Sequence, residues 1–295
     1  MKLNLPKPGR YILAVSGGLD SVCLLDLMSK QAGYELIVAH FDHGIRPDSA
    51  KDKEFVANIA ERYGLKFVSQ KGNLGPGASE AKAREARYAF LDRVKNEIKA
   101  DAIITAHHLD DRYETLIINL IRGTGRKGLS SISETASIKR PLLGVSRDEL
   151  KKYAKSNKLI WHEDPTNSED KYLRNYIRSN VTTRLKKEDK KKLESLMDRQ
   201  LKLNYKIDNL TLNLIASDDP TKLNLSLLNV LPHKESREVV ALWLRQNKLP
   251  SFNKNTIERL TVAAKTKRPG TRIDIYGQSS VRIEKGFLAL SNSER

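Results

Sequence analysis

The sequence predicts an α/β protein with a doubly wound parallel sheet, followed by a smaller, mostly helical domain that ends in short strands. Four short apolar runs occupy the first 110 residues, and helical patterns lie between them. Continuous rather than alternating hydrophobicity is typical of strands that are buried on both faces of a parallel sheet. Strands that alternate with helices at this spacing indicate right-handed βαβ units.

The predicted strands of this sheet are residues 11–15, 35–41, 65–70 and 101–108. The predicted helices are residues 22–30, 52–64, 79–98 and 110–123. In open sheets of this class, ligands bind beyond the carboxyl ends of the strands. The polar segments SGGLDS (16–21), FDHG (41–44) and HHLDD (107–111) all follow predicted strands. We therefore expect a ligand site at this edge of the sheet.

The pattern changes after about residue 185, which predicts a first domain of residues 1–185 and a second of residues 186–295. Residues 185–216 have apolar positions at three- and four-residue spacing, which predicts one or two helices. Residues 236–248 and 253–266 predict further helices. Residues 271–291 have strand-like runs broken at glycines, which predicts a hairpin or a small meander.

The formal net charge of +17 predicts attraction to a polyanion, with nucleic acid ahead of an anionic membrane. A lysine-rich surface that only keeps the protein in solution is the alternative. Residues 181–295 carry 23 Lys+Arg against 13 Asp+Glu, a net charge of +10, whereas the longer stretch 1–180 carries +7. The second domain is therefore the expected electrostatic contact with RNA.

Cysteine content and hydropathy exclude several classes of protein. Cys23 is the single cysteine, so no disulfide framework, zinc knuckle or cysteine-held iron–sulfur cluster can form. No apolar stretch reaches the length of a membrane span, and the N-terminal apolar run of five residues is too short for a signal peptide. We expect a soluble, cytoplasmic protein.

The segment SGGLDS lies between a predicted strand and a predicted helix. Gly17 and Gly18 let backbone N–H groups approach an anion, and the following helix directs its positive end at the same place. Asp20 would repel a phosphate unless a cation such as Mg²⁺ lies between them. A glycine-rich turn without a ligand is the alternative. The candidate ATP-binding residues are Ser16, Gly17, Gly18, Leu19, Asp20 and Ser21.

The segment after the second strand offers Asp42 and His43 as contacts for a nucleotide or its metal. Taken alone, it reads more simply as a helix-entry loop in which Asp48 or Ser49 is the N-cap. The segment after the fourth strand is richer in chemistry. No histidine there lies four residues from another, which a helical zinc site would require.

Asp111 and Glu114 are three residues apart, so a helix brings them to one face as an anionic pair. Such a pair suits an ammonium group as well as a metal. Arg122 ends the same predicted helix. Arg84 and Arg87 lie along one side of the preceding helix with Glu80, and salt bridging between Glu80 and Arg84 at i,i+4 is the simpler explanation for that pair. In the dense polar segment 161–181, the residue types that suit phosphate or base contacts are Arg174, Asn175 and Arg178.

The ordered set of these segments resembles the tRNA(Ile)-lysidine synthetases, within the PP-loop ATP pyrophosphatases. It comprises SGGLDS, DHGIR, EAKAREARY, TAHHLDD–ET–RGTG–GL, RPLL (140–143) and WHEDPTN–YLRNYIR, in order over roughly residues 10–180. The last segment, 271–290, resembles the end of that family's first C-terminal domain, and a second C-terminal domain is expected to be absent. Where the family commonly has DDQAET, this chain has Arg112 and Tyr113 in place of Gln and Ala.

The resemblance implies an ATP-dependent ligase. ATP adenylates the 2-carbonyl oxygen of the wobble cytidine in a CAU-anticodon tRNA(Ile), and free L-lysine displaces AMP to form lysidine. The implied cofactors are ATP and Mg²⁺, with Asp20 as a metal ligand. Asp111 and Glu114 would bind lysine, and Arg84, Arg87, Arg122, Arg174, Asn175 and Arg178 would contact the nucleotide or the tRNA. A homodimer is compatible with the resemblance.

Catalysis also needs a proton acceptor, because the lysine amine has a pKa near 10.4 and must lose a proton before it attacks. His107, His108 and Asp111 all remain open for that role, and Asp20, Asp42, His107 and Asp111 are the candidate catalytic residues. Two alternative functions stay open as well. One is another PP-loop enzyme, such as a tRNA thiolase or an amide-forming synthetase, and the other is a non-catalytic RNA-binding protein on the same fold.

Overall fold

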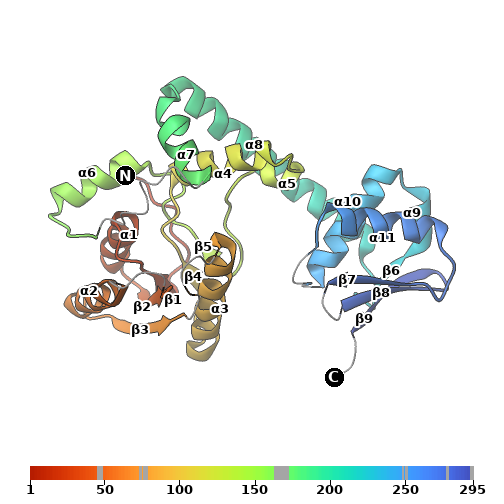
Figure 1. Ribbon diagram of the computed structural model, residues 1–295, viewed down its shortest axis with the longest axis horizontal. Helices are drawn as coiled ribbons and strands as arrows, with labels where there is room; N and C mark the ends of the chain where they lie inside the picture. The colour runs from red at the N-terminus through yellow and green to blue at the C-terminus, as the bar shows by residue number, and fades with distance from the viewer. Residues whose placement is uncertain are drawn as a thin grey trace. The chain divides into compact units, whose positions relative to one another are not determined.

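The computed structural model describes residues 1–44, 49–72, 75, 79–162, 173–247, 249, 252–276 and 279–292. They belong to two compact units, Met1–Gln200 and Leu201–Arg295 (Figure 1). The predicted domain boundary at residues 185/186 precedes helix α8 (Lys187–Ile215), whereas the division between the compact units falls inside this helix. Asp48 and residues 163–172, with most of the segment WHEDPTN, lie outside the described residues.

The first unit is built on a five-stranded sheet in the order β3-β2-β1-β4-β5, and every neighbouring pair is parallel. This confirms the predicted fold class. The chain order reverses between β1 and β4, so the crevice where such folds bind ligands lies between the carboxyl ends of these two strands. The strands are β1 (Gly9–Ala14), β2 (Tyr34–Asp42), β3 (Lys66–Lys71), β4 (Ala102–Ile104) and β5 (Ile138–Lys139).

Helices cover both faces of this sheet because its central strands are apolar on both sides (Figure 1). Leu13 of β1 packs on one face with α1 (Leu19–Ser29), α2 (Ser49–Arg62) and α6 (Arg147–Ser156). Ile12, which points the opposite way, packs against α3 (Glu80–Ile98). The alternation of side chains along a strand is thus sufficient to build the three-layer core.

The segment predicted as a strand over 101–108 forms strand structure only over Ala102–Ile104. Its last four residues connect the strand to helix α4 (Leu109–Ile121), with His108 as the N-cap. The backbone N–H of His108 donates to Asp111 Oδ2 at 3.0 Å. The end of the strand is therefore set by a capping interaction that apolar periodicity does not reveal.

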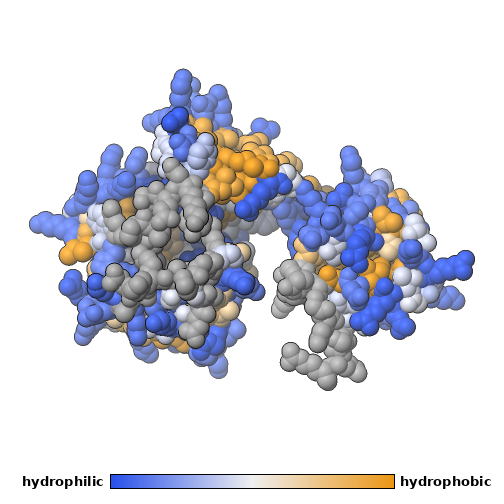
Figure 2. Space-filling model, in the orientation of Figure 1, coloured by the Kyte–Doolittle hydropathy of each residue, from blue (hydrophilic) through white to orange (hydrophobic). Residues whose placement is uncertain are grey.

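Beyond α4, the first unit contains α5 (Arg126–Leu129), α7 (Leu173–Asn180), the short helix η2 (Thr182–Arg184) and the first part of α8. Tyr113 and Leu116 of α4 pack against Met197 of α8 in a small buried cluster. Figure 2 shows a hydrophobic area over α4 and α5, where Leu120 and Ile121 are largely exposed.

The second unit packs α9 (Leu225–Val230), α10 (His233–Gln246) and α11 (Lys254–Thr266) against a four-stranded antiparallel sheet. The strand order is β6-β9-β8-β7, with β6 (Lys222–Asn224), β7 (Arg272–Tyr276), β8 (Ser279–Glu284) and β9 (Phe287–Asn292). The meander predicted over residues 271–291 is confirmed, and β6 extends it. Within the described part of the chain, no helix is both long and apolar enough to cross a membrane.

Candidate functional site

The SGGLDS loop is organised by the buried hydroxyl of Ser21. Ser21 Oγ accepts hydrogen bonds from the backbone N–H groups of Ser16 and Gly17, both at 3.2 Å, and donates to the carbonyl of Gly18 at 2.9 Å. Ser16 Oγ lies 3.2 Å from the same oxygen. Ser21 therefore closes the loop on itself at the start of α1, and its hydroxyl is used internally in this structure.

The two glycines of the loop meet different requirements. Gly17 has a φ of +93°, which L side chains rarely adopt. Gly18 is the N-cap of α1 in an extended conformation, and a Cβ there would lie no closer than 3.6 Å to its neighbours, among them Ser16 Oγ. The backbone needs a glycine at residue 17. At residue 18 the structure accommodates a side chain, so any requirement for glycine there comes from a ligand.

His162 ties this loop to the end of the α6 region. Its backbone N–H donates to the carbonyl of Gly17 at 3.0 Å. Its imidazole stacks on Phe55 of α2, with ring centroids 4.0 Å apart, and Nδ1 lies 2.8 Å from Asp52 Oδ1. Sequence reasoning missed this role, because no local pattern indicates that the segment after α6 returns to the loop after β1.

The acidic residues predicted at the sheet edge meet around His108. Its imidazole is almost completely buried, and Nε2 lies 3.5 Å from Asp20 Oδ2 and 3.6 Å from Asp111 Oδ2. Nδ1 lies 3.8 Å from Asp110 Oδ2. Burial opposes the charged imidazole, but the three carboxylates outweigh it and raise the pKa of His108 above its ordinary value. His108 therefore lies between the carboxylates at the starts of α1 and α4.

Glu114 is fully buried one turn further along α4. Arg178 of α7 donates to it in a bidentate arrangement, with Nε 2.7 Å from Oε1 and Nη2 3.1 Å from Oε2. Arg178 Nη2 is also 3.6 Å from Asp111 Oδ1, and Arg174 Nε is 3.8 Å from Glu114 Oε2. The predicted acidic pair and two of the predicted arginines thus form one charged cluster between α4 and α7.

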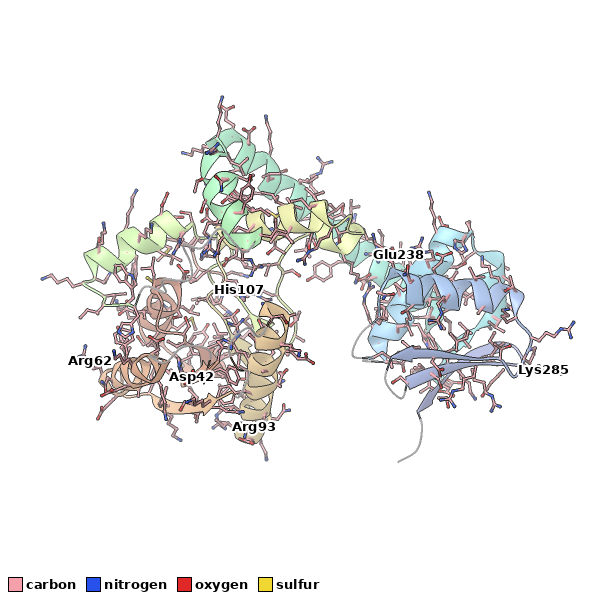
Figure 3. The ribbon with its side chains drawn as sticks, viewed as in Figure 1. Asp42, Arg62, Arg93, His107, Glu238 and Lys285 are labelled. Atoms are coloured by element: carbon pink, nitrogen blue, oxygen red, sulfur yellow. The ribbon has the colours of Figure 1, made fainter. Side chains whose placement is uncertain are left out.

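Asp42 and His107 lie at the ends of β2 and β4 in the same unit (Figure 3). Asp42 is buried, and its Oδ1 accepts a hydrogen bond from the N–H of Gly44 at 2.8 Å. His107 Nδ1 lies 2.9 Å from Thr105 Oγ1. Burial lowers the pKa of His107 below its ordinary value, Asp111 opposes this, and three arginines, Arg140, Arg84 and Arg87, lower it further. The imidazole of His107 is accordingly neutral at pH 7.

Arg84 and Arg87 of α3 lie over the ring of Tyr88, at 4.8 and 5.5 Å from its centroid. Burial lowers the pKa of His43, and the positive charge of Arg87 lowers it further. Arg87 therefore influences His43, which follows β2, as well as His107, which follows β4. Arg140, in the segment RPLL, is buried and joins them, a role that sequence reasoning did not assign. Arg122 is exposed at the C-cap of α4, and Asn175 is partly buried on α7.

Arg112 and Tyr113, which depart from the common family pattern, face helix α8. Arg112 Nη2 lies 2.7 Å from Asp198 Oδ1, and the hydroxyl of Tyr113 donates to Glu194 Oε1 at 2.5 Å. Both side chains are therefore engaged in helix packing on the side of α4 that faces α8.

Comparison with known proteins agrees with this geometry. The PP-loop domain family ATP_bind_3 matches residues 2–185. A tRNA(Ile)-lysidine synthase from Nostoc is 31% identical over 317 residues, with 97% of this chain and 92% of the relative covered. The chain belongs to the tRNA(Ile)-lysidine synthase family.

A second member of this family, from Thermus thermophilus, is 45% identical over 183 residues, which covers 60% of this chain and 36% of the relative. The match thus spans about a third of that protein. Among solved structures, the U34-tRNA thiolase NcsA from Methanococcus maripaludis has a TM-score of 0.56 at 22% identity, with 67% of this chain and 74% of that chain covered. This likeness shows a shared fold.

Proposed function

We propose that this member of the lysidine synthase family ligates free L-lysine to the wobble cytidine of CAU-anticodon tRNA(Ile). In the first step, the cytidine 2-oxygen attacks the α-phosphorus of ATP and pyrophosphate leaves. In the second, the lysine ε-amine attacks C2, the C2–O bond breaks and AMP leaves. The observation that carries the proposal is the 3.5 Å approach of Asp20, in the SGGLDS loop, to His108 at the start of α4.

The SGGLDS loop would receive the triphosphate through the backbone N–H groups that start α1. Asp20 Oδ1 is buried and accepts no hydrogen bond, which fits a ligand for Mg²⁺. No three His, Cys, Asp or Glu side chains among the described residues are grouped to hold a metal by themselves, so phosphate oxygens and water would complete its coordination. Mg²⁺ would neutralise the charge on the pyrophosphate that leaves.

The charged cluster between α4 and α7 suits lysine, which carries two ammonium groups and a carboxylate. Asp111 and Glu114 provide the anionic pair for an ammonium group, and Arg174 and Arg178 provide cations. In this structure the guanidinium of Arg178 occupies the position beside Glu114 that an ammonium group would take. We propose that lysine or tRNA competes for these arginines during the reaction, which leaves Asp111 as the first contact for lysine.

We propose His107 as the proton acceptor for the attacking amine, with Asp111 as the alternative. A base must be unprotonated before it takes a proton, and the neutral imidazole of His107 meets this condition. Arg84, Arg87 and Arg140 depress the basicity of His107, and the phosphates of a bound nucleotide would offset these charges. We therefore expect His107 to become a stronger base once ATP or the adenylated tRNA is bound.

RNA contacts would come from both units. In the first, Arg122, Asn175 and the arginines of α7 are the candidate contacts near the anticodon. In the second, the basic stretch 181–295 would bind backbone phosphates without regard to sequence. Burial raises the pKa of Cys23 to about 12, so this thiol is a poor nucleophile and sulfur transfer through it is disfavoured.

The decisive experiment incubates the protein with ATP, lysine and a CAU-anticodon tRNA(Ile), followed by mass spectrometry of the nucleosides. Lysidine should form only when all three are present, and a tRNA with a different wobble base is the control. Pyrophosphate release without lysine would report the adenylation step alone. If tRNA binds but ATP is never cleaved, the chain is an RNA-binding protein on this fold. Sulfur incorporation instead of lysidine would indicate a thiolase.

A further inference from the structure

Among the described residues of the second unit, the helices pack against one face of the sheet, and the opposite face is called the uncovered face. Val281, Ile283 and Leu288 point to the covered face and pack with Trp243 of α10 and Leu260 of α11. Side chains alternate along a strand, so the residues between them belong to the uncovered face. That face carries the exposed side chain of Arg282, and Phe287 is 38% exposed.

Strand register places three cations of this face in a single row. Arg272 of β7 is opposite Arg282 of β8, Arg282 is opposite Ala289 of β9, and Lys222 of β6 is opposite the same Ala289. With strands about 4.8 Å apart, the row crosses all four strands over roughly 14 Å. Ala289 lies between Lys222 and Arg282 in this row, and its side chain is shorter than theirs.

This arrangement of charge does not serve the stability of the sheet. Like charges directly opposite each other, as at Arg272 and Arg282, destabilise an antiparallel pair. Arg272 lies 3.3 Å from Asp274 and Lys222 lies 3.5 Å from Asp219, but both pairs are exposed and contribute little. Within the described ranges, Arg282 makes no ion pair. A row of cations in these positions is better explained by an anionic partner.

An aromatic side chain lies beside the row. Phe287 of β9 is two residues from Ala289 on the same face, in register with Glu284 and Asn224. An exposed aromatic ring next to cations on an open antiparallel sheet is the arrangement with which many RNA-binding domains stack an unpaired base. Glu284 lies opposite Phe287 on β8 and carries a negative charge. The positive charge of this face is therefore concentrated in the row of Lys222, Arg282 and Arg272.

We propose that the uncovered face of this sheet is an RNA-binding surface, in which Lys222, Arg282 and Arg272 bind backbone phosphates and Phe287 stacks on an unpaired base. It deepens the proposed function, on which it rests, by naming the face of the second unit that contacts tRNA. The occupant is the phosphodiester backbone of RNA, because the row carries three cations and the exposed ring of Phe287 lies beside it.

The test is the affinity for tRNA as a function of salt, measured by fluorescence anisotropy. The double variant Lys222→Gln/Arg282→Gln should bind roughly ten- to thirtyfold more weakly at 0.15 M salt, and the slope of log K against log salt should fall by about 1.5–2. The matched control is Lys234→Gln/Lys267→Gln, which removes the same charge from α10 and the end of α11 on the other side of the sheet. It should change affinity less than threefold.

Phe287→Ala should weaken binding by about a factor of ten, whereas Phe287→Tyr should keep it, because either ring can stack. Thermal unfolding of the row variant should be unchanged or slightly higher, since a repulsive pair is lost. Equal losses in the row variant and the control, or none in either, would overturn the proposal while lysidine formation by the wild type still stood. Wild-type protein that binds tRNA through this face but forms no lysidine would instead overturn only the proposed reaction.

Discussion

The buried carboxylate of Glu114 is held by the guanidinium of Arg178 through two hydrogen bonds of 2.7 and 3.1 Å. Burial raises the pKa of Glu114 above its ordinary value, while Arg178 opposes this rise. The pair joins α4 to α7, and Arg178 reaches on to Asp111 at 3.6 Å. Any change at Glu114 therefore affects the packing of two helices as well as the charge of the proposed lysine site.

Glu114→Gln should raise the lysine concentration for half-maximal rate roughly ten- to a hundredfold, which is about 1.4 kcal/mol per decade. Formation of the adenylated tRNA without lysine should change much less. Each single variant, Glu114→Gln or Arg178→Met, should also lower the free energy of unfolding by about 3–5 kcal/mol, because the partner is left buried and unpaired.

The double variant Glu114→Leu/Arg178→Met separates the two roles. Replacing a buried ion pair with apolar residues commonly restores stability, so its unfolding temperature should approach that of the wild type. The lysine concentration for half-maximal rate should stay as high as in Glu114→Gln. Recovery of both stability and lysine affinity in the double variant would show that the pair is only structural. If adenylation is lost while the dependence of the rate on lysine stays normal, Glu114 and Arg178 belong to the nucleotide or metal site.

The two glycines of the SGGLDS loop should respond differently to alanine. Gly17→Ala should lower the free energy of unfolding by about 1–3 kcal/mol, because φ is +93°. Gly18→Ala should change stability by less than about 0.5 kcal/mol. It should still weaken ATP binding about tenfold or more, since the added methyl group obstructs a phosphate at the backbone N–H groups. A normal ATP affinity of Gly18→Ala, measured by calorimetry, would show that the SGGLDS loop does not bind the phosphates.

His107→Gln should slow the transfer of lysine to the adenylated tRNA by about a hundredfold or more, which is the usual contribution of a general base. Adenylation should be affected much less, since that step releases no proton from lysine. Single-turnover assays, with and without lysine, measure the two steps separately. If His107→Gln slows both steps equally, His107 acts on the nucleotide, and Asp111 becomes the remaining acceptor.

Asp26 gives the first unit a pH-dependent contribution to stability. Burial alone would raise its pKa, but hydrogen bonds from Lys30, Tyr153 and Tyr63 outweigh burial and hold the pKa below its ordinary value. A depressed carboxyl pKa stabilises the fold above the pKa of the unfolded chain, and this contribution is lost as the pH falls through the folded pKa.

Asp26→Asn should accordingly lower the free energy of unfolding by about 1–3 kcal/mol at neutral pH. The difference from wild type should begin to shrink below about pH 4, where the carboxyl of the unfolded chain protonates, and it should disappear as the pH falls through the depressed pKa of the folded carboxyl. Denaturant unfolding at a series of pH values measures both. A difference that stays constant down to pH 2 would indicate a packing defect in place of a lost charge.

Arg112 and Tyr113 are expected to affect the packing of α8 rather than catalysis. Tyr113→Phe removes the 2.5 Å hydrogen bond to Glu194 and should lower the free energy of unfolding by about 1 kcal/mol. The dependence of the rate on ATP and lysine should stay within twofold of wild type. A tenfold change in either dependence would show that the contact with α8 positions the site.

The sequence alone determined the class of fold and the residues that carry chemistry. Buried parallel strands leave continuous apolar runs, and polar clusters at their carboxyl ends stand out against them, so the SGGLDS loop, Asp42, His107 and Asp111 could be found by reading along the chain. The order of these motifs also indicated the family, because a series of short motifs is far more specific than any one of them.

Only the tertiary structure decided which of these residues touch. Local periodicity does not encode the return of His162 to Gly17, the approach of Asp20 to His108 or the pairing of Glu114 with Arg178. These contacts join segments more than 60 residues apart, and they depend on strand order and on the directions in which helices leave the sheet. The row of cations across β6, β9, β8 and β7 has the same origin, because strand register alone aligns Lys222 with Arg282 and Arg272.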